Sequence, residues 1–153
     1  MADIVIDTHI AIWYFADPSQ FSQPAENAID LAESKGTIFV SSITIVELIF
    51  LVEKNKIPAD VLVSLWSAID DPTTAFRRIE LNREISDEVE NISRPTVPEM
   101  PDRIIAATAL HLNLPLIKKF KHYKIFKLSG KYKPILLSRT TDFWPARLKF
   151  WIR

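Results

Sequence analysis

Residues 3–15, DIVIDTHIAIWYF, decide the fold because they place a short apolar strand directly before a helix. The β-rich run at residues 4–6 stops at the carboxylate of Asp7, and Thr8 opens an apolar run with helical character. An apolar strand that leads straight into a helix is typical of an open α/β sheet with helices on both faces. Ligands bind such sheets beyond the carboxyl ends of the strands, at the topological switch point. We therefore expect Asp7 to lie at a functional crevice.

The rest of the chain continues the alternation of strands and helices. We expect helices over residues 8–16, 22–35, 43–54, 58–70, 82–93 and 103–112, and strands over 37–40, 76–81 and from 116 onward. Such alternation favours a parallel sheet. One α/β domain is expected over residues 1–117, followed by a basic, aromatic-rich segment of uncertain structure over residues 118–153. The helix from residue 43 is apolar almost all round, which predicts that it is buried.

The composition excludes several classes of site. The chain of 153 residues is long enough for one domain with a substantial core. It has no cysteine, which excludes disulfides, thiolate zinc sites and cysteine nucleophiles, and its two glycines make a glycine-rich phosphate loop improbable. The longest apolar run, residues 43–52, is too short to cross a bilayer. We expect a cytoplasmic protein that does not bind membranes.

The net charge of zero hides a strong asymmetry. Residues 1–117 contain 8 basic and 18 acidic residues, whereas residues 118–153 contain 11 basic residues and one acid, Asp142. This asymmetry indicates either a nucleic-acid partner or a segment that folds against the acidic part. Aromatic and basic residues lie close together near the end: Trp144, Arg147, Lys149, Phe150, Trp151 and Arg153. They would bind RNA through phosphate contacts and stacking, or form an amphipathic segment that packs on the body or on a partner.

Three acids are the candidates for chemistry. Glu47 lies within the apolar helix, where a carboxylate must be metal-bound, protonated or paired, for example with a lysine or arginine. Asp102 lies in a first helical turn and Asp7 at a helix start, so each also suits a purely structural role. All three fall at the carboxyl ends of the expected strands, where they would raise one another's pKa values. A Mg²⁺ or Mn²⁺ ion would relieve that repulsion.

Three segments resemble the PIN domain, particularly the VapC-type toxins of toxin–antitoxin modules. They are IVIDTH (4–9), SSITIVEL (41–48) and MPDRIIAATALHLNLPLI (100–117), and the likeness covers residues 3–117. The resemblance implies a parallel sheet flanked by helices, a Mg²⁺- or Mn²⁺-dependent endoribonuclease, an RNA substrate and an antitoxin partner. A homodimer is a further candidate assembly, and the sequence leaves the oligomeric state open. By motif position, Asp7, Glu47 and Asp102 would be the metal-site acids. Thr8 would be a polar neighbour of Asp7, or alternatively a helix cap.

The chain departs from the family pattern after Ile117. The family usually continues with a Thr-Arg-Asp-like element that supplies a fourth acid, but here Phe120 takes the expected acid position. Asp142 and Glu99 are candidate replacements, and the alternative role of Glu99 is a solvated loop acid. A frameshift in the coding sequence is one way in which such a tail would arise. We therefore expect weak metal binding and low or absent ribonuclease activity.

Two further functions stay open. The chain would be a catalytically impaired PIN-like protein that only binds an antitoxin, or a nucleic-acid-binding protein that acts through its basic tail. The three histidines, His9, His111 and His122, are too widely spaced in the sequence to form a ligand cluster. Each is expected to be an ordinary surface or partly buried residue.

Overall fold

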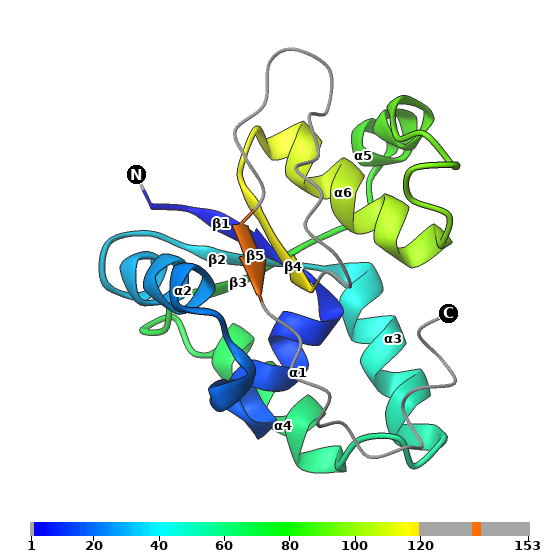
Figure 1. Cartoon of the computed structure of the whole chain (residues 1–153). Helices are drawn as coiled ribbons and strands as arrows, with labels where there is room; N and C mark the ends of the chain where they lie inside the picture. Colours follow the sequence, from blue (N-terminus) through cyan, green and yellow to red (C-terminus); the bar gives the residue numbers. More distant parts are fainter. Residues whose placement is uncertain (1, 120–135, 139–153) are drawn as a thin grey trace.

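In the part of the chain that the structure describes, five parallel strands form one sheet in the order β3-β2-β1-β4-β5 (Figure 1). The computed structural model describes residues 2–119 and 136–138. The strands are β1 (Ile4–Ile6), β2 (Ile38–Ser41), β3 (Phe76–Ile79), β4 (Leu116–Lys119) and β5 (Leu136–Ser138). From β1 the chain builds β2 and β3 on one side and then adds β4 on the other. The switch point of the sheet therefore lies between β1 and β4.

Six α-helices and two 3₁₀ turns connect the described strands. The α-helices are α1 (Thr8–Ala16), α2 (Gln23–Lys35), α3 (Ser42–Glu53), α4 (Ala59–Asp70), α5 (Arg83–Glu88) and α6 (Met100–Leu112). The 3₁₀ turns are η1 (Pro18–Gln20) and η2 (Val89–Asn91). The predicted α/β class is confirmed, although the helix expected over 82–93 divides into α5 and η2. None of the helices in the described part of the chain combines the length and apolar character that crossing a membrane requires.

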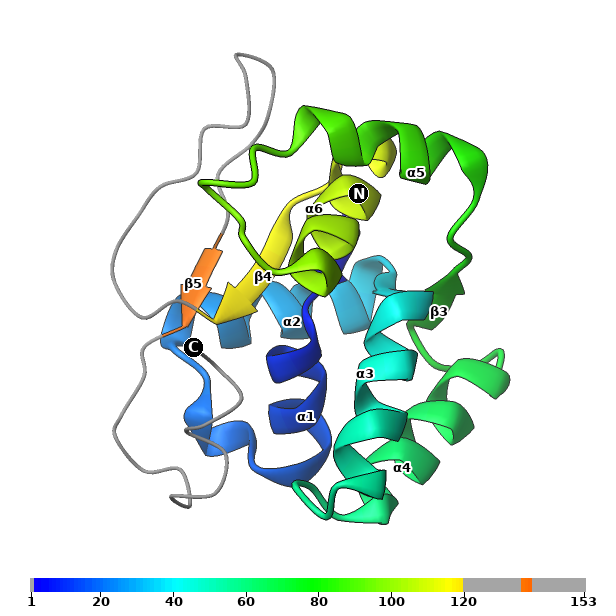
Figure 2. The ribbon, with the colours of Figure 1, turned by 90° about the vertical axis from the view of Figure 1, so that its right-hand side faces the viewer.

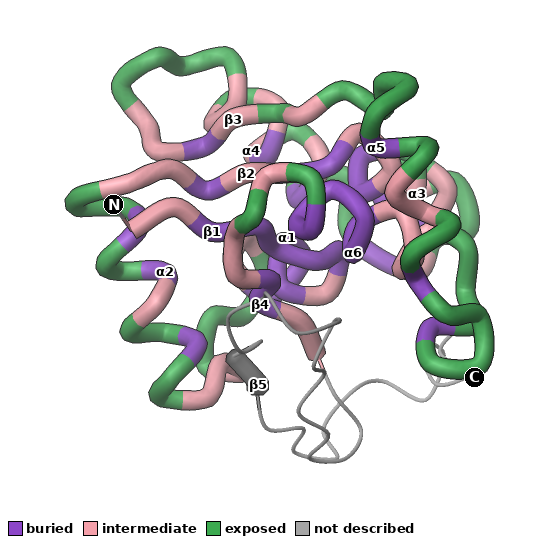
Figure 3. The backbone as a smooth tube through the Cα atoms, turned by 90° about the horizontal axis from the view of Figure 1, so that it is seen from above, coloured by how far each residue is buried: buried purple, intermediate pink, exposed green. Residues whose placement is uncertain are grey.

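The side chains of β1 point alternately into two cores, as in any strand. Ile4 and Ile6 pack into the core that contains side chains of α1, α2, α3 and α4, whereas Val5 packs into the core formed with α5 and α6. Figure 2 shows α5 and α6 on one side of the sheet and α1 on the other. In Figure 3 the buried segments lie mainly along the strands and along α1 and α6. The predicted helices on both faces of the sheet are confirmed.

The predicted boundary at residue 117 falls inside a strand. β4 extends to Lys119 and pairs with β5, whose residues 136–138 belong to the basic segment. The division into residues 1–117 and 118–153 stays a prediction, but the structure places the first two residues of the basic segment in the sheet.

The expectation that α3 is buried is correct for one face of the helix and wrong for the other. Leu48 is fully buried, but Val46 and Ile49 expose 57% and 39% of their surface. The helix packs against α1, α4 and α6 on one side only, so its apolar residues continue onto the solvent side. Glu47 therefore lies at the border between the buried and the exposed face.

Gly36 is the C-cap of α2, and the backbone of Ala2 passes so close to it that a side chain does not fit there. A Cβ at residue 36 would lie 2.6 Å from the carbonyl carbon and oxygen of Ala2. We expect Gly36→Ala to lower the free energy of unfolding by about 1–3 kcal/mol, since the backbone must shift to make room. Urea unfolding followed by circular dichroism measures this, with Ser34→Ala on the exposed side of α2 as the control. Equal stability of the two variants would contradict the close approach.

Candidate active site

Asp7 joins three elements at the switch point. Its backbone N–H donates to the carbonyl of Ile117 over 3.0 Å, which ties the end of β1 to β4. Its carboxylate accepts hydrogen bonds from the backbone N–H of Ile10 (2.8 Å) and of Lys119 (3.0 Å). Only 3% of Asp7 is exposed. Asp7 is thus the N-cap of α1, and the same carboxylate lies at the carboxyl end of β1, beside β4.

Glu47 is held by a hydroxyl group rather than by a cation. The Thr8 hydroxyl donates to Oε2 of Glu47 over 2.5 Å and lies 3.4 Å from the Thr44 hydroxyl. Thr8 therefore orients Glu47 instead of capping α1. Among the described residues, Glu47 forms no ion pair with a lysine or arginine, which was the structural alternative.

Thr44 is a polar neighbour of the site that the sequence analysis missed. It lies on α3 three residues before Glu47, and residues at this spacing share one face of a helix. Its side chain is completely buried in an otherwise apolar segment. The spacing of Thr44 and Glu47 could have revealed this neighbour in the sequence. A threonine one helical turn from a carboxylate can join the hydrogen-bond network of that carboxylate.

Asp102 contacts a lysine from the next strand. It lies in the first turn of α6, and its side chain is 39% exposed. The ammonium of Lys118, on β4, lies 3.6 Å from Oδ2 of Asp102. Only 14% of the Lys118 side chain is exposed. β4, the strand that follows α6, therefore places the positive charge of Lys118 next to Asp102 at the start of α6.

Arg103 fixes the start of α6. Its guanidinium donates to the carbonyl of Ile92 over 3.2 Å and to the carbonyl of Val89 over 3.0 Å. These contacts fasten the helix to η2. The two residues of this acid–arginine pair therefore have different roles. Arg103 positions the helix, whereas Asp102 faces the site.

The electrostatics show that the three acids share one environment. The pKa of Asp7 is raised to about 6, mainly by burial. The negative charge of Asp102 adds to this rise, and the positive charge of Lys118 opposes it. Burial also raises the pKa of Glu47 to about 7, opposed by the hydrogen bond from Thr8 and reinforced by Asp102 and Asp7. Mutual repulsion between the acids is the effect that the sequence analysis expects.

The donor chemistry fits a hard divalent cation, although the acids are engaged with the chain itself. Carboxylate oxygens are preferred ligands of Mg²⁺ and Mn²⁺. Within residues 2–119 and 136–138, however, no three acidic or histidine side chains are arranged to hold an ion as they stand. Asp7 accepts backbone N–H groups, Glu47 a hydroxyl and Asp102 an ammonium. Binding of an ion would require some of these partners to be exchanged.

Of the two candidates for a fourth acid, the structure describes Glu99 but not Asp142. Glu99 is an exposed residue at the N-cap of α6 without a side-chain capping hydrogen bond. It is close enough to contribute to the raised pKa of Glu47, as the weakest of the contributing acids. Asp142 and Phe120, like His122, lie outside the described residues.

His9 lies nearer to the site than the sequence indicates. Its Nδ1 is 4.0 Å from Oδ2 of Asp7, and a quarter of its side chain is exposed. Burial lowers the pKa of His9, and Lys119 and Lys118 lower it further, so the ring stays neutral near pH 7. The expectation of an ordinary surface or partly buried residue holds for both described histidines, since His9 is partly buried and His111 is exposed.

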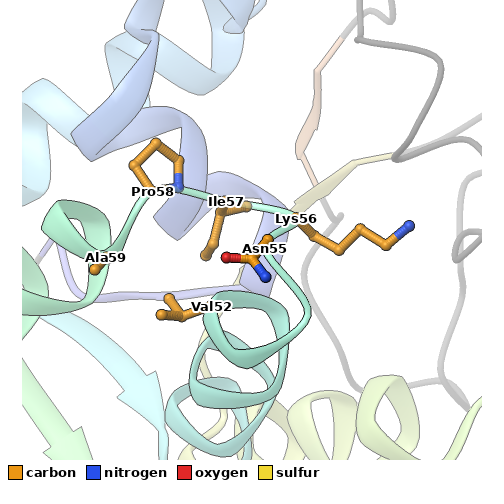
Figure 4. A pocket seen from close by; sticks show the side chains of 6 residues that line it. All are labelled: Val52, Asn55, Lys56, Ile57, Pro58 and Ala59. Carbon is orange, nitrogen blue, oxygen red and sulfur yellow. The ribbon is translucent and has the colours of Figure 1, made fainter.

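An open hollow lies at the far end of α3, away from the acids (Figure 4). It is lined by Val52, Asn55, Lys56, Ile57, Pro58 and Ala59. Glu47 lies in the middle of α3, whereas the hollow begins at Val52 near its C-terminal end and continues past the helix. No acidic side chain lines the hollow, and we therefore assign it no part in the chemistry.

Glu47 should make the metal-free protein less stable as the pH rises. Its folded pKa of about 7 lies above the ordinary 4.5, so between these values the folded chain binds more protons than the unfolded chain. The stabilising contribution is complete below pH 4.5 and is lost as the pH rises through 7. Glu47→Gln cannot titrate, so its melting temperature in chelator should rise relative to the unsubstituted protein between pH 5 and pH 8.

Thermal unfolding at several pH values measures this difference. Other titrating groups, including His9, are common to both proteins and largely cancel in the comparison. Glu84→Gln, at an exposed position on α5, is the control and should show no such trend. A difference that does not change with pH would contradict the raised pKa of Glu47.

Comparison with known proteins supplies the family. The family model described as PIN domain matches residues 4–121. The chain belongs to the PIN domain family. A relative, ribonuclease VapC22 of Mycobacterium tuberculosis (strain ATCC 25618 / H37Rv), is 25% identical over 119 residues, which cover 78% of this chain and 88% of the relative. The predicted resemblance to VapC-type PIN domains is confirmed.

Solved structures share the fold of this PIN domain. The crystal structure of VapBC2 from Rickettsia felis bound to a promoter DNA fragment aligns with a TM-score of 0.57 at 19% identity, covering 75% of this chain and 86% of that one. A toxin–antitoxin complex from Klebsiella pneumoniae aligns with a TM-score of 0.50 at 22% identity, covering 74% and 83%. At these identities the likeness establishes the fold alone.

Proposed function

We propose that this PIN domain protein is a Mg²⁺- or Mn²⁺-dependent endoribonuclease, the toxin component of a type II toxin–antitoxin system. The placement of three acids around the carboxyl ends of β1 and β4 supports the proposal. Asp7 is hydrogen-bonded to β4, Glu47 accepts the hydroxyl of the adjacent Thr8, and Asp102 contacts Lys118 of β4. The similarity to ribonuclease VapC22 supports RNA as the substrate, with hydrolysis of its phosphodiester bonds.

The three carboxylates would hold the ion, and neighbouring groups would fix their positions. A bound Mg²⁺ or Mn²⁺ lowers the pKa of a coordinated water and stabilises the charge that develops on the phosphate. Asp7 is oriented by the N–H groups of Ile10 and Lys119, and Glu47 by the Thr8 hydroxyl. This chemistry requires no nucleophilic side chain, which agrees with a chain that lacks cysteine.

The partner would be a cognate antitoxin. Both structural neighbours described above come from toxin–antitoxin proteins. Val46 and Ile49, one turn apart on α3, are exposed apolar residues of the kind found at protein interfaces. A second copy of the chain is the other proposed protein partner.

We expect the activity to be low in the chain as it stands. Three acids give a weaker oxygen-ligand site than four, because cation affinity follows the charge of the ligands. Phe120 takes the position where the family pattern has its fourth acid. The neighbouring Lys118 adds a positive charge within contact distance of Asp102.

Cleavage of a single-stranded RNA by the full chain tests the proposal. Weak cleavage with Mn²⁺ that stops when a chelator is in excess is the expected result. Cleavage that persists in chelator would contradict a metal-dependent mechanism. RNA that is bound without being cut, at any metal concentration, would instead support the binding-only alternative.

A further inference from the structure

Lys118 occupies an unusual place for a cationic side chain. Its ammonium lies 3.6 Å from Oδ2 of Asp102, and the side chain is only 14% exposed. It also acts on Asp7, whose pKa it lowers against the effect of burial. One positive charge thus acts on two of the three acids.

The backbone around Lys118 is tightly anchored. Immediately before it, the carbonyl of Ile117 accepts the N–H of Asp7 over 3.0 Å. Immediately after it, the N–H of Lys119 donates to Oδ2 of Asp7 over 3.0 Å. Asp7 therefore holds β4 on both sides of residue 118, so that the ammonium can leave Asp102 only by rotation of its own side chain.

A divalent cation at these acids would compete with this ammonium. Mg²⁺ and Ca²⁺, which bracket Mn²⁺ in size, bind carboxylate oxygens at roughly 2.0–2.6 Å. An ion bound to Asp102 at such a distance would lie within a few ångströms of an ammonium that itself contacts Asp102. Two cations this close in a partly buried site repel strongly.

We propose that Lys118 is an internal counter-ion that closes the acidic site to divalent metal while its ammonium contacts Asp102. Metal binding then requires the side chain to turn away. This inference rests on the proposed function, because it concerns the same site. It adds a cause of weak metal binding that is separate from the loss of a fourth acid, and one that a single substitution removes.

The adjacent lysine provides a matched control. The side chain of Lys119 takes a different course, and its ammonium lies over the ring of Trp13, 5.5 Å from the centroid. Its backbone N–H, which contacts Asp7, does not depend on the side chain. Lys119→Met therefore removes the same charge one residue away without removing the contact to Asp102.

Calorimetric titration of Mn²⁺ into the metal-free full chain is the test. Lys118→Met keeps most of the apolar length of the side chain and removes the ammonium. We expect it to tighten Mn²⁺ binding by about tenfold or more, because one cation no longer opposes the other. Lys119→Met should tighten binding about twofold or less, since it is the charge of Lys118, and not that of Lys119, that lowers the pKa of Asp7. Lys118→Arg should bind as weakly as the unsubstituted protein.

Thermal unfolding gives a second readout that a merely structural lysine would not produce. In chelator, Lys118→Met should melt below the unsubstituted protein, because the acids have lost their counter-ion. In saturating Mn²⁺ it should show the larger rise in melting temperature. A lysine that only supports the fold would lower the melting temperature by the same amount with and without metal.

The outcomes separate this inference from the proposed function. If the unsubstituted protein binds Mn²⁺ through Asp7 and Lys118→Met binds it no more tightly, the counter-ion role is wrong and the metal site stands. If none of the proteins binds Mn²⁺, the proposed metal-dependent function is wrong and the counter-ion role fails with it. Equal tightening in Lys118→Met and Lys119→Met would also overturn the inference, because it would show a general charge effect.

Discussion

Asp7→Asn is expected to reduce Mn²⁺-dependent RNA cleavage by about 100-fold or more while leaving the fold intact. Asparagine removes the negative charge at the point where the proposed cation, β1 and β4 meet. It keeps a side-chain oxygen for the N–H of Ile10, and asparagine is among the preferred N-cap residues, but its amide nitrogen cannot accept the N–H of Lys119. The retained cap of α1 should keep the domain folded, and the circular dichroism described below checks this before the loss of activity is assigned to the site.

Initial rates of cleavage at saturating Mn²⁺ measure the effect. Asp60→Asn, in the first turn of α4 and exposed, makes the same change of charge away from the site and serves as the control. Circular dichroism of both variants checks the fold. A rate for Asp7→Asn equal to that of Asp60→Asn would remove Asp7 from the site.

Leu48→Ala is expected to lower the free energy of unfolding by about 2–5 kcal/mol, whereas Val46→Ala should change it by about 0.5 kcal/mol or less. Leu48 is completely buried and leaves a cavity when truncated, while Val46 is 57% exposed. The two positions flank Glu47 on the same helix. The difference between the two variants therefore tests the orientation of α3, which determines where the Glu47 carboxylate points.

Urea unfolding of the two variants makes the comparison. Both remove only aliphatic carbon atoms, so their difference reports burial more than chemistry. Similar losses for Leu48→Ala and Val46→Ala would mean that α3 is buried all round, as its sequence alone indicates. The half-buried position of Glu47 would then be wrong.

The order of elements was predictable because short-range signals define it. The run at residues 4–6 followed by Asp7 predicts a strand that ends at a helix cap, and both features are present. Asn82 likewise predicts the start of α5, where its side chain accepts the N–H of Ile85. Caps and strand ends depend on neighbouring residues, which the sequence displays directly.

The orientation of α3 was not predictable in the same way. Its residues are apolar on nearly every side, so no face is distinguished by the pattern. Only packing against α1, α4 and α6 decides that Leu48 is buried and Val46 exposed. A helix with such a uniform composition requires tertiary information.

The candidate site likewise combines features that the sequence predicts with contacts that only the tertiary structure reveals. Asp7, Glu47 and Asp102 lie near enough to influence one another's pKa values, and this proximity follows from strand order and helix direction, which the sequence pattern predicts. The contact of Lys118 with Asp102 joins residues 16 positions apart through the return of α6 into β4. Its cationic character was visible in the sequence, but whether it contacts the acids depends on the course of a long, flexible side chain.

Mn²⁺ titration of the metal-free full chain and of three single variants tests the central claim most directly. The variants are Asp7→Asn, Glu47→Gln and Asp102→Asn, each of which removes one carboxylate with little change of shape. The account predicts that the unsubstituted protein binds Mn²⁺ weakly but saturably at one site, and that every variant binds it at least about tenfold more weakly. Unchanged affinity in all three variants would contradict the claim that these acids form a metal site.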